Sequence, residues 1–375
     1  MSCDPYSLAL DGVRKLTPYQ PGKPVSELER ELGLNSVVKL ASNENPLGPS
    51  PRSLAAMQQC LSAVGEYPDG NGFGLKTALA NRYQLSTDQI TLGNGSNDIL
   101  ELIARAFLRP GLKSVFSEHA FAVYPLATIA TGADCKPVPA LPMDSKMPMG
   151  HDLDAMAAAL TDDVRVVFVA NPNNPTGTWV EREPLLAFLR SVPANCLVVL
   201  DEAYTEYVEA GRFDQPHELL AQFPNLIITR TFSKAWGLAG LRVGYGMSSP
   251  EIADLLNRVR QPFNVNSVAL AAAEAALSDN DHILQSRALN DAGLQQWQAA
   301  CHEMKLQYLP SLGNFIAINM QRDGQQLFDS LLRKGVITRP VGAYGMPEWL
   351  RISIGTEEQN QTAIKALQEV LSTSA

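Results

Sequence analysis

Short apolar runs alternate with amphipathic stretches between about residues 88 and 250. The apolar runs are rich in β-branched residues, and their apolar residues follow one another directly, which is typical of strands buried on both faces. Three runs predict such strands: VRVVFVA (164–170), CLVVLDEAY (196–204) and NLIITRTFSK (225–234), and QITLG (89–93) predicts a further short strand. Residues 94–111 and 181–190 instead place apolar side chains at helical spacing. Strands separated by helices indicate βαβ units and a mostly parallel sheet.

The pattern changes after about residue 250, where long helical stretches come first and short strands follow. The predicted strands are NFIAINM, VITRP and LRISIG, and TEEQ (356–359) is typical of a capping box that opens the last helix. We therefore expect an α/β fold with a large domain over residues 46–274, whose parallel sheet is sandwiched by helices. A smaller α+β domain would cover 275–375. Residues 1–45 are Pro-rich and irregular, and we expect them to form an arm that packs with the small domain.

The composition is that of an ordinary globular protein, with 375 residues, 45% hydrophobic and 18% charged. A net charge of −9 argues against nucleic acid or an anionic membrane as a partner. The N-terminus lacks the basic start and apolar core of a signal peptide, and no apolar run approaches the roughly 18 residues of a membrane span. The five cysteines are scattered and show no metal-binding spacing, as is typical of the reducing cytoplasm. The five histidines form no HExxH or HxH pair, so we expect no metal site.

Two motifs lie where strands are predicted to end, and this is where open α/β sheets bind ligands. In GNGSND (93–98), Ser96 and Asn97 open a helix whose free N–H groups suit a phosphate, although a simple capped turn has the same pattern. In ANPNNPTG (170–177), two prolines make a rigid turn. Asn171 is the first residue after the strand, so its amide can point at a bound ligand. An ordinary turn is the alternative.

Two further motifs add charged groups at the same edge. DEAY (201–204) places Asp201 at the rim of the sheet, where a carboxylate suits a cationic ring nitrogen, and Tyr204 offers a phenol; a helix cap is the plainer explanation for the aspartate. TFSKAWGLAGLRVGYG (231–246) contains Lys234 between a hydroxyl pair and an apolar, glycine-broken stretch. Burying an isolated ammonium is costly. Burial lowers the pKa of a lysine and makes it a nucleophile, and a Schiff base with an aldehyde removes the isolated charge.

Taken together, the four motifs describe a site for pyridoxal phosphate. They supply a binding site for the coenzyme phosphate and a carboxylate for its pyridinium nitrogen. They also supply an amide and a phenol for its ring hydroxyl, and an amine for its aldehyde. Arg242, eight residues after the lysine, adds a guanidinium for the phosphate.

In their order and spacing, ANPNNPTG, DEAY and TFSKAWGLAGLRVGY resemble the fold-type I aminotransferases, which depend on pyridoxal phosphate. Further segments are similar to the histidinol-phosphate aminotransferase subgroup: LTPYQPGKP (16–24), LASNENPLGPSP (40–51), EYPDG (66–70), GNGSNDILELI (93–103) and LRISIGT (350–356). The resemblance covers most of the chain.

The resemblance implies roles for residues around the coenzyme. Lys234 would form the Schiff base and shuttle a proton, Asp201 would keep the pyridine nitrogen protonated, and Asn171 and Tyr204 would bond the ring oxygen. The phosphate would be held by Ser96, Asn97, Thr231, Ser233 and Arg242. Tyr67 of EYPDG would reach that phosphate from the neighbouring subunit, which implies a homodimer. An aromatic ring would stack on the coenzyme. Phe121 and Tyr124 are the candidates, and core packing is the alternative for both.

Substrate contacts follow from the same resemblance. Arg351 in LRISIG matches the arginine that binds a carboxylate or phosphate, which a planar guanidinium can hold in a bidentate manner. Arg339 in ITRP and Tyr19 in TPYQPGKP would be extra contacts to a substrate phosphate, with a surface ion pair as the other interpretation of a strand-end arginine.

The resemblance implies an aminotransferase that works by ping-pong half-reactions on L-histidinol phosphate and 2-oxoglutarate. An aromatic amino-acid aminotransferase and a threonine-phosphate decarboxylase would use the same machinery. A nicotinamide dehydrogenase is disfavoured because GNGSND lacks the third glycine of GxGxxG and no matching acid follows. A regulator on this fold would need an attached DNA-binding module, for which we expect no room, and the chain is acidic.

Overall fold

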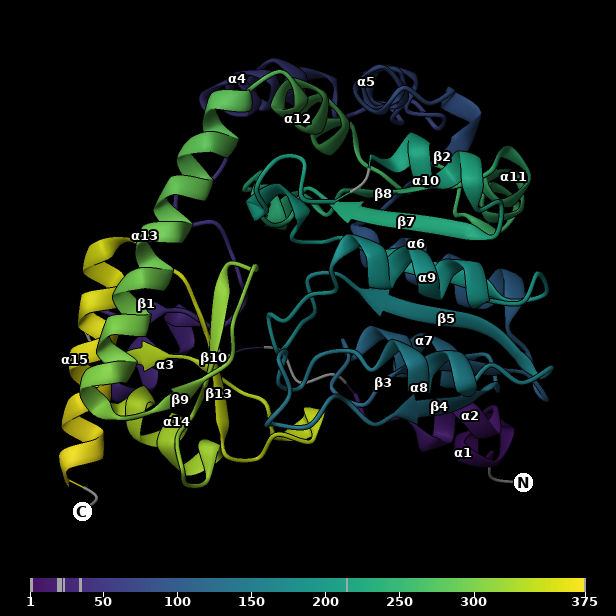
Figure 1. The fold of residues 1–375 in the computed structure, drawn as a ribbon. Coiled ribbons are helices and arrows are strands. Elements are labelled where there is room, and N and C mark those ends of the chain that lie inside the picture. Colours follow the sequence, from purple (N-terminus) through teal and green to yellow (C-terminus); the bar gives the residue numbers. More distant parts are fainter. Residues whose placement is uncertain (1–2, 19–21, 23, 34–35, 214, 374–375) are drawn as a thin grey trace.

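The computed structural model describes residues 3–18, 22, 24–33, 36–213 and 215–373. Figure 1 shows a large sheet on one side, covered by helices, and a smaller sheet with its own helices on the other. The large sheet has seven strands. In spatial order they are β2 (Ile90–Gly93), β8 (Gly244–Met247), β7 (Leu226–Thr231), β6 (Leu197–Asp201), β5 (Val164–Ala170), β3 (Lys113–Ser117) and β4 (Asp134–Val138). Only β8 runs antiparallel to its neighbours, so the predicted mostly parallel sheet is confirmed.

Both faces of this sheet are buried, because side chains alternate between two apolar layers along each strand. In β5, Val167 and Val169 belong to one layer and Val166 and Phe168 to the other. The first layer is covered by α5 (Phe73–Tyr83), α8 (Leu153–Ala158), α9 (Arg182–Ser191), α10 (Pro216–Gln222) and α12 (Ser267–Leu277). The second layer is covered by α6 (Ser96–Phe107), α7 (Val123–Ala130) and α11 (Pro250–Val259). Outside them, α4 (Pro51–Cys60) packs on α12.

The smaller sheet is antiparallel throughout. Its order is β12 (Arg339–Pro340), β13 (Trp349–Ser353), β10 (Phe315–Asn319) and β9 (Gln307–Tyr308). It shares an apolar core with α13 (Asn280–Met304), α14 (Gly324–Arg333) and α15 (Glu357–Thr373). The capping box before α15 is confirmed, since the backbone N of Thr356 donates to Gln359 Oε1 and that of Gln359 donates to Thr356 Oγ1. Figure 1 shows α13 running from the top of the large unit down the side of the small one.

The N-terminal arm is more regular than its sequence suggests. It forms α1 (Pro5–Leu8), α2 (Asp11–Lys15), α3 (Val25–Leu32) and strand β1 (Val38–Lys39). Asp4 caps α1 and Pro5 occupies its first turn, so proline starts a helix here instead of preventing one. The arm does not pack with the small unit alone. α2 lies on α7 of the large unit, whereas β1 pairs in parallel with β11 (Val336–Ile337).

In the part of the chain that the structure describes, five short 3₁₀ helices connect these elements: η1 (Leu61–Ala63), η2 (Thr87–Gln89), η3 (Thr205–Tyr207), η4 (Ala239–Leu241) and η5 (Gly342–Tyr344). Among the described residues, no helix combines the length and the apolar character that a membrane crossing requires.

Candidate active site

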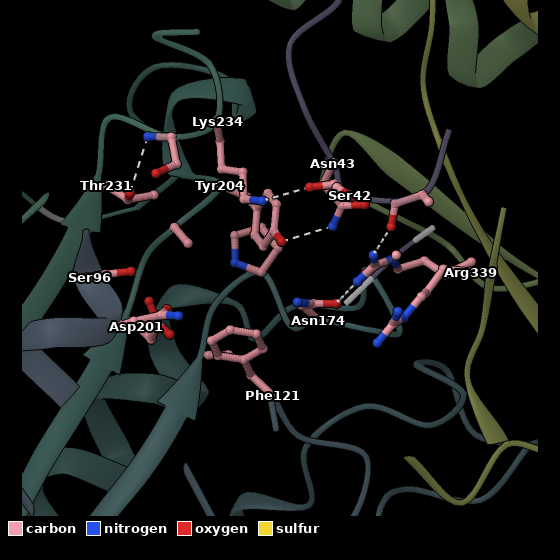
Figure 2. A pocket seen from close by; sticks show the side chains of 18 of the residues that line it. Ser42, Asn43, Ser96, Phe121, Asn174, Asp201, Tyr204, Thr231, Lys234 and Arg339 are labelled. Atoms are coloured by element: carbon pink, nitrogen blue, oxygen red, sulfur yellow. Dashed lines mark hydrogen bonds between the residues drawn. The ribbon is translucent and has the colours of Figure 1, made fainter. Parts of the chain in front are cut away.

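The predicted motifs meet in one pocket of about 200 Å³. It lies at the carboxyl ends of β5, β6 and β7, between the large unit and the small one, and Figure 2 shows its lining side chains. Twelve of the residues singled out from the sequence line it: Ser96, Asn97, Phe121, Tyr124, Asp201, Tyr204, Thr231, Ser233, Lys234, Arg242, Arg339 and Arg351. The structure therefore brings together residues that are up to 255 positions apart (351 − 96) in the chain.

Asp201 is the buried carboxylate of the pocket. It ends β6 on the same face as Val199, so it faces the layer that holds Tyr124 of α7. The Tyr124 hydroxyl donates to Asp201 Oδ2 at 2.8 Å, and the Thr229 hydroxyl donates to Oδ1 at 3.0 Å. Burial raises the pKa of Asp201, although the two hydroxyl donors oppose the rise. A buried carboxylate that is held in this way is suited to a cationic partner.

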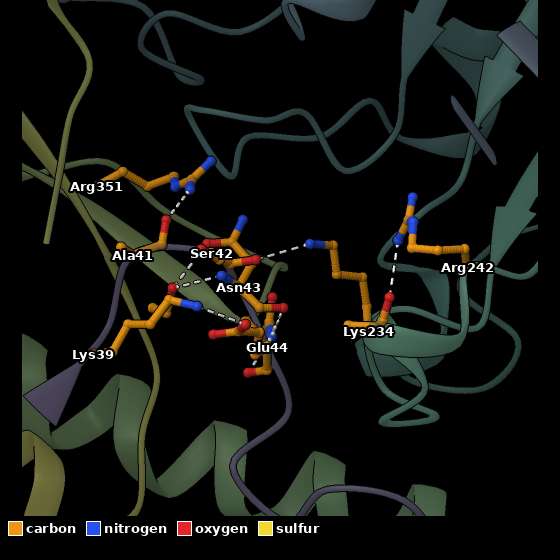
Figure 3. A network of polar contacts seen from close by, with 11 residues as sticks. Lys39, Ala41, Ser42, Asn43, Glu44, Lys234, Arg242 and Arg351 are labelled. Carbon is orange, nitrogen blue, oxygen red and sulfur yellow. Dashed lines mark hydrogen bonds and ion pairs between the residues drawn. The ribbon is translucent and has the colours of Figure 1, made fainter. Parts of the chain in front are cut away.

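Lys234 extends into the pocket from the loop after β7. Its neighbours Phe232 and Trp236 are fully buried and anchor the loop in the core. Figure 3 shows its Nζ donating to the backbone oxygen of Ser42 at 3.0 Å. Burial, followed by the charge of Arg351, lowers the pKa of the Lys234 amine to about 7. A large fraction of this amine is thus neutral and nucleophilic near neutral pH.

Tyr204 presents a protonated phenol beside this amine. Its ring centroid lies 5.8 Å from Lys234 Nζ, and burial raises the pKa of the hydroxyl to about 12. Asn43 Nδ2 donates to the Tyr204 hydroxyl oxygen at 2.9 Å. The phenol can therefore act as a hydrogen-bond donor in the pocket at any ordinary pH.

Hydroxyl groups, a guanidinium and a helix N-terminus gather at one end of the pocket. Ser96 is the first residue of α6, which follows Gly95 with its φ of 80°. Arg242 donates to Ser233 Oγ at 3.3 Å, and the Ser233 backbone N donates to Thr231 Oγ1 at 3.1 Å. The φ of 80° favours glycine at position 95, and a Cβ there would lie 2.8 Å from Arg242 Nη2, so the guanidinium would have to shift. The helix N-terminus and the guanidinium together favour an anion such as phosphate.

Two arginines lie at the small-domain side of the pocket. Arg339 and Arg351 are paired across β12 and β13, so both guanidinium groups come from neighbouring strands of the small sheet. Arg351 is buried and donates to Asn174 Oδ1 and to the backbone oxygen of Ala41, each at 2.6 Å. Its guanidinium also lies 5.5 Å from the Phe315 ring centroid. This packing fixes a planar cation where it can bind a carboxylate or phosphate of a substrate.

The structure corrects the prediction that the amide of Asn171 points at a ligand. Asn171 Nδ2 donates to the backbone oxygen of Val180, and its Oδ1 accepts from the backbone N of Val180, so both polar atoms are used within the turn. Asn174, three residues later, lines the pocket instead. The proline-rich turn brings Val180 back to Asn171, and periodicity could not show which of the two asparagines faces inward.

The two aromatic candidates have different surroundings. Phe121 is partly exposed and lines the pocket wall (Figure 2). Tyr124 lies below it, fully buried, with its ring stacked on Phe168 at 4.6 Å between centroids. Phe121 is thus the ring available for a ligand, while Tyr124 supports Asp201.

Of the two remaining candidates, Tyr67 does not line the pocket. The Tyr67 side chain is 83% exposed, and its ring stacks on Phe263 at 4.8 Å. Tyr19 lies outside the described residues. No group of His, Cys, Asp and Glu side chains in the described part of the chain could hold a metal ion.

Sequence reasoning missed three pocket residues with polar side chains, Ser42, Asn43 and Asn174, besides the glycine, alanine and proline residues of the lining. Ser42 and Asn43 belong to LASNENPLGPSP, where the polar run SNEN in a Pro-rich arm is the only local signal. The role of Asn43 depends on contacts with residues 161 and 310 positions away, and that of Ser42 on a contact 192 positions away, which the local pattern does not report.

Comparison with known proteins places the chain among transaminases. A family model for aminotransferase class I and II matches residues 35–367. The chain is 58% identical to histidinol-phosphate aminotransferase 2 of Pseudomonas fluorescens over 99% of each chain. It is also 58% identical to the protein of that name from Pseudomonas aeruginosa, covering 97% of this chain and 98% of the relative. The crystal structure of histidinol-phosphate aminotransferase from Sinorhizobium meliloti in complex with pyridoxal-5'-phosphate superposes with a TM-score of 0.89. It is 30% identical, over 97% of this chain and 98% of that one.

Proposed function

Because the chain belongs to the class I and II aminotransferase family, we propose that it is a transaminase that uses pyridoxal phosphate to move the amino group of L-histidinol phosphate to 2-oxoglutarate. The products would be imidazole-acetol phosphate and L-glutamate, as part of histidine biosynthesis. The observation that carries the proposal is the arrangement of Lys234 and Asp201 in one pocket, with an anion site at one end and two arginines at the other.

The residues present fit the coenzyme. The buried Asp201 carboxylate would pair with the pyridine nitrogen, and Tyr204 and Asn174 would face the ring oxygen. Phe121 would cover the ring. Ser96, Asn97, Thr231, Ser233 and Arg242 would hold the phosphate at the N-terminus of α6. When bound, pyridoxal phosphate supplies an aldehyde that condenses with amines and a cationic ring that withdraws electrons from the substrate Cα.

The side chains of this protein would then position the substrate and move one proton. With its pKa lowered to about 7, the Lys234 amine can accept a proton from the substrate Cα. The same amine would then deliver this proton to C4′ of the coenzyme. Arg351 and Arg339 would bind the anionic end of the substrate. A phosphate in histidinol phosphate and a carboxylate in glutamate satisfy the same planar guanidinium, so one pocket can serve both half-reactions.

Steady-state rates with three amino donors test the substrate proposal. We expect kcat/KM for histidinol phosphate to exceed the values for phenylalanine and for threonine phosphate, and we expect threonine phosphate to release no CO₂. A higher kcat/KM for phenylalanine would mark the protein as an aromatic amino-acid aminotransferase. Release of CO₂ from threonine phosphate would identify the protein as a threonine-phosphate decarboxylase.

A homodimer with shared active sites forms part of the proposal. Between residues 54 and 73, five large side chains are at least 45% exposed: Leu54, Leu61, Val64, Tyr67 and Phe73. Such an accumulation of exposed apolar surface is typical of an interface. Tyr67 lies among these side chains and does not line its own pocket, which supports a contact with the coenzyme phosphate of the neighbouring subunit.

The cytoplasm is the compartment we propose. All five cysteines are free thiols, and two of them, Cys196 and Cys301, are buried in apolar surroundings that raise the pKa of each thiol to about 12. Unpaired thiols in this number suit a reducing environment.

A further inference from the structure

Asn43 of the arm hydrogen-bonds to the large and the small unit at once. Its Nδ2 donates to the hydroxyl oxygen of Tyr204, and its backbone N donates to Ser353 Oγ at 2.7 Å. Ser353 Oγ donates to Asn43 Oδ1 at 3.0 Å. The side chain is buried, and its backbone has a φ of 55°, a left-handed conformation that asparagine adopts more readily than most residues. Figure 2 shows Asn43 beside Tyr204 at the mouth of the pocket.

These contacts fix the direction of each hydrogen bond. A backbone N–H can only donate, so Ser353 Oγ accepts from Asn43 N and keeps its own hydrogen for Asn43 Oδ1. The amide oxygen therefore faces Ser353, and the NH₂ group faces Tyr204. The Tyr204 oxygen is then an acceptor in this contact, and its single hydrogen has to point elsewhere.

From this polarity we infer that Asn43 is a positioning residue. It keeps the hydroxyl hydrogen of Tyr204 directed into the pocket, toward the ring oxygen of the coenzyme, and Ser353 holds the Asn43 amide in the orientation that this requires. The inference rests on the proposed function. It adds a residue of the arm and a residue of the small domain to the groups that determine the protonation of the coenzyme.

The charged and titratable groups around the Tyr204 hydroxyl do not replace Asn43. Arg351, Asp201, Lys234 and Tyr344 all act on it electrostatically. However, Arg351 donates to Asn174 and Ala41, and Lys234 donates to the Ser42 backbone. Ser353 also follows Arg351 by two positions on β13. The strand that would bind the anionic end of the substrate thus also fixes the orientation of the phenol.

Asn43→Asp tests the polarity. Aspartate keeps the size and tolerates the left-handed backbone, but a carboxylate only accepts, so the Tyr204 hydrogen would turn toward it. We expect the pH midpoint of the visible absorbance of the bound coenzyme to rise by about one unit, because an anionic ring oxygen loses a donor. The coenzyme dissociation constant should increase about fivefold.

A double-mutant cycle separates this effect from the added negative charge. In a Tyr204→Phe background, Asn43→Asp should move the midpoint by much less, because the hydroxyl through which it acts is gone. Ser353→Ala adds no charge and frees the amide to turn, so it should shift the midpoint in the same direction by a smaller amount. If the Asn43→Asp variant does not fold, the pH midpoint of the Ser353→Ala variant tests the inference instead.

Asn314→Ala is the matched control. Asn314 Nδ2 donates to the backbone oxygen of Asn43 at 2.9 Å, so it anchors the same residue without contacting the amide or the phenol. We expect it to lower the melting temperature and to leave the midpoint unchanged. Wild-type midpoints in both Asn43→Asp and Ser353→Ala would overturn the inference while the proposed function stands. A wild-type protein that acquires no visible absorbance with pyridoxal phosphate would overturn both.

Discussion

The hydroxyl of Tyr124 donates a hydrogen bond of 2.8 Å to Oδ2 of Asp201 beneath the pocket. Removing it with Tyr124→Phe leaves the stacking on Phe168 intact and withdraws one of the two hydroxyl donors that keep the carboxylate ionised. The pKa of Asp201 should rise further, and a cationic ring nitrogen should be held less firmly. We expect about tenfold weaker binding of pyridoxal phosphate to the apoenzyme, measured by absorbance titration.

Tyr83→Phe is the control for that experiment. Its hydroxyl is also buried and paired, with Tyr245 at 2.8 Å, but it lies in the layer on the other face of the sheet. This variant should lose stability and keep its affinity for the coenzyme. Equal affinities of wild type and Tyr124→Phe would contradict the role given to Tyr124.

The lowered pKa of Lys234 predicts how the apoenzyme responds to pH. An unfolded lysine titrates near 10.5 and the folded one near 7, so between these values the unfolded chain binds more protons and stability rises with pH. Lys234→Met removes this contribution. The difference in unfolding free energy, wild type minus variant, should therefore increase from pH 7 to pH 9, as measured by urea denaturation. A difference that stays flat or falls would mean that the amine is not desolvated.

A buried ion pair lies on the face of the sheet opposite to Asp201. Arg230 Nη2 is 2.6 Å from Glu202 Oε2, and both side chains are at most 10% exposed. Arg230→Met would leave a buried carboxylate without its cation and should cost about 3–5 kcal/mol in urea unfolding. The exposed pair of Arg258 and Asp254 gives the comparison, since Arg258→Met should cost less than about 0.5 kcal/mol. Similar losses in the two variants would argue against a desolvated pair.

Gly95→Ala tests the anion site at the start of α6. The added methyl would meet Arg242 Nη2, and the residue would have to keep a φ of 80°, which strains any side chain. We expect affinity for pyridoxal phosphate and for inorganic phosphate to fall together, by about tenfold for the coenzyme. At Gly240 a Cβ meets nothing within 4 Å, so Gly240→Ala should bind both normally. If the variant loses affinity for the coenzyme but keeps its affinity for inorganic phosphate, the anion site does not lie at the start of α6.

Complementation tests the shared active site. The proposed dimer has a mass of twice 40.7 kDa, and Tyr67→Ala and Lys234→Ala should each have low activity. When the two variants are mixed and allowed to exchange subunits, each hybrid contains one site with both lesions and one with neither. Activity should therefore recover toward a quarter of the wild-type value, because about half of the dimers are hybrids with one intact site. If no activity returns although hybrids form, Tyr67 acts within its own subunit.

Four strands of the large sheet (β2, β5, β6 and β7) and the charged core of the site could be predicted because they follow from short-range patterns, whereas β3, β4 and β8 were not predicted. Each apolar run fixes a strand, and the end of a parallel strand fixes where Asp201 and Lys234 lie. The sequence could not show whether Asn171 or Asn174 faces the pocket, because side chains in an irregular turn do not alternate with a fixed period. Ser42 and Asn43 could not be placed, because their contacts are with Tyr204, Lys234 and Ser353, which are far away in the sequence. The helices of the arm are short, and only α1 has a side-chain N-cap, Asp4 before Pro5, in a stretch that otherwise resembles a loop.

Adjacent acids at the end of β6 occupy opposite sides of the sheet, with Asp201 toward the pocket and Glu202 toward Arg230. The register that pairs Asp201 with Thr229 is what separates them. Inserting or deleting one residue within this strand would exchange the two carboxylates, so that Asp201 would face Arg230 and the longer Glu202 would face the coenzyme site. Active relatives of this protein should accordingly tolerate substitutions in β6 but show insertions and deletions only beyond its ends. A relative with a gap inside this strand should have lost the aminotransferase activity.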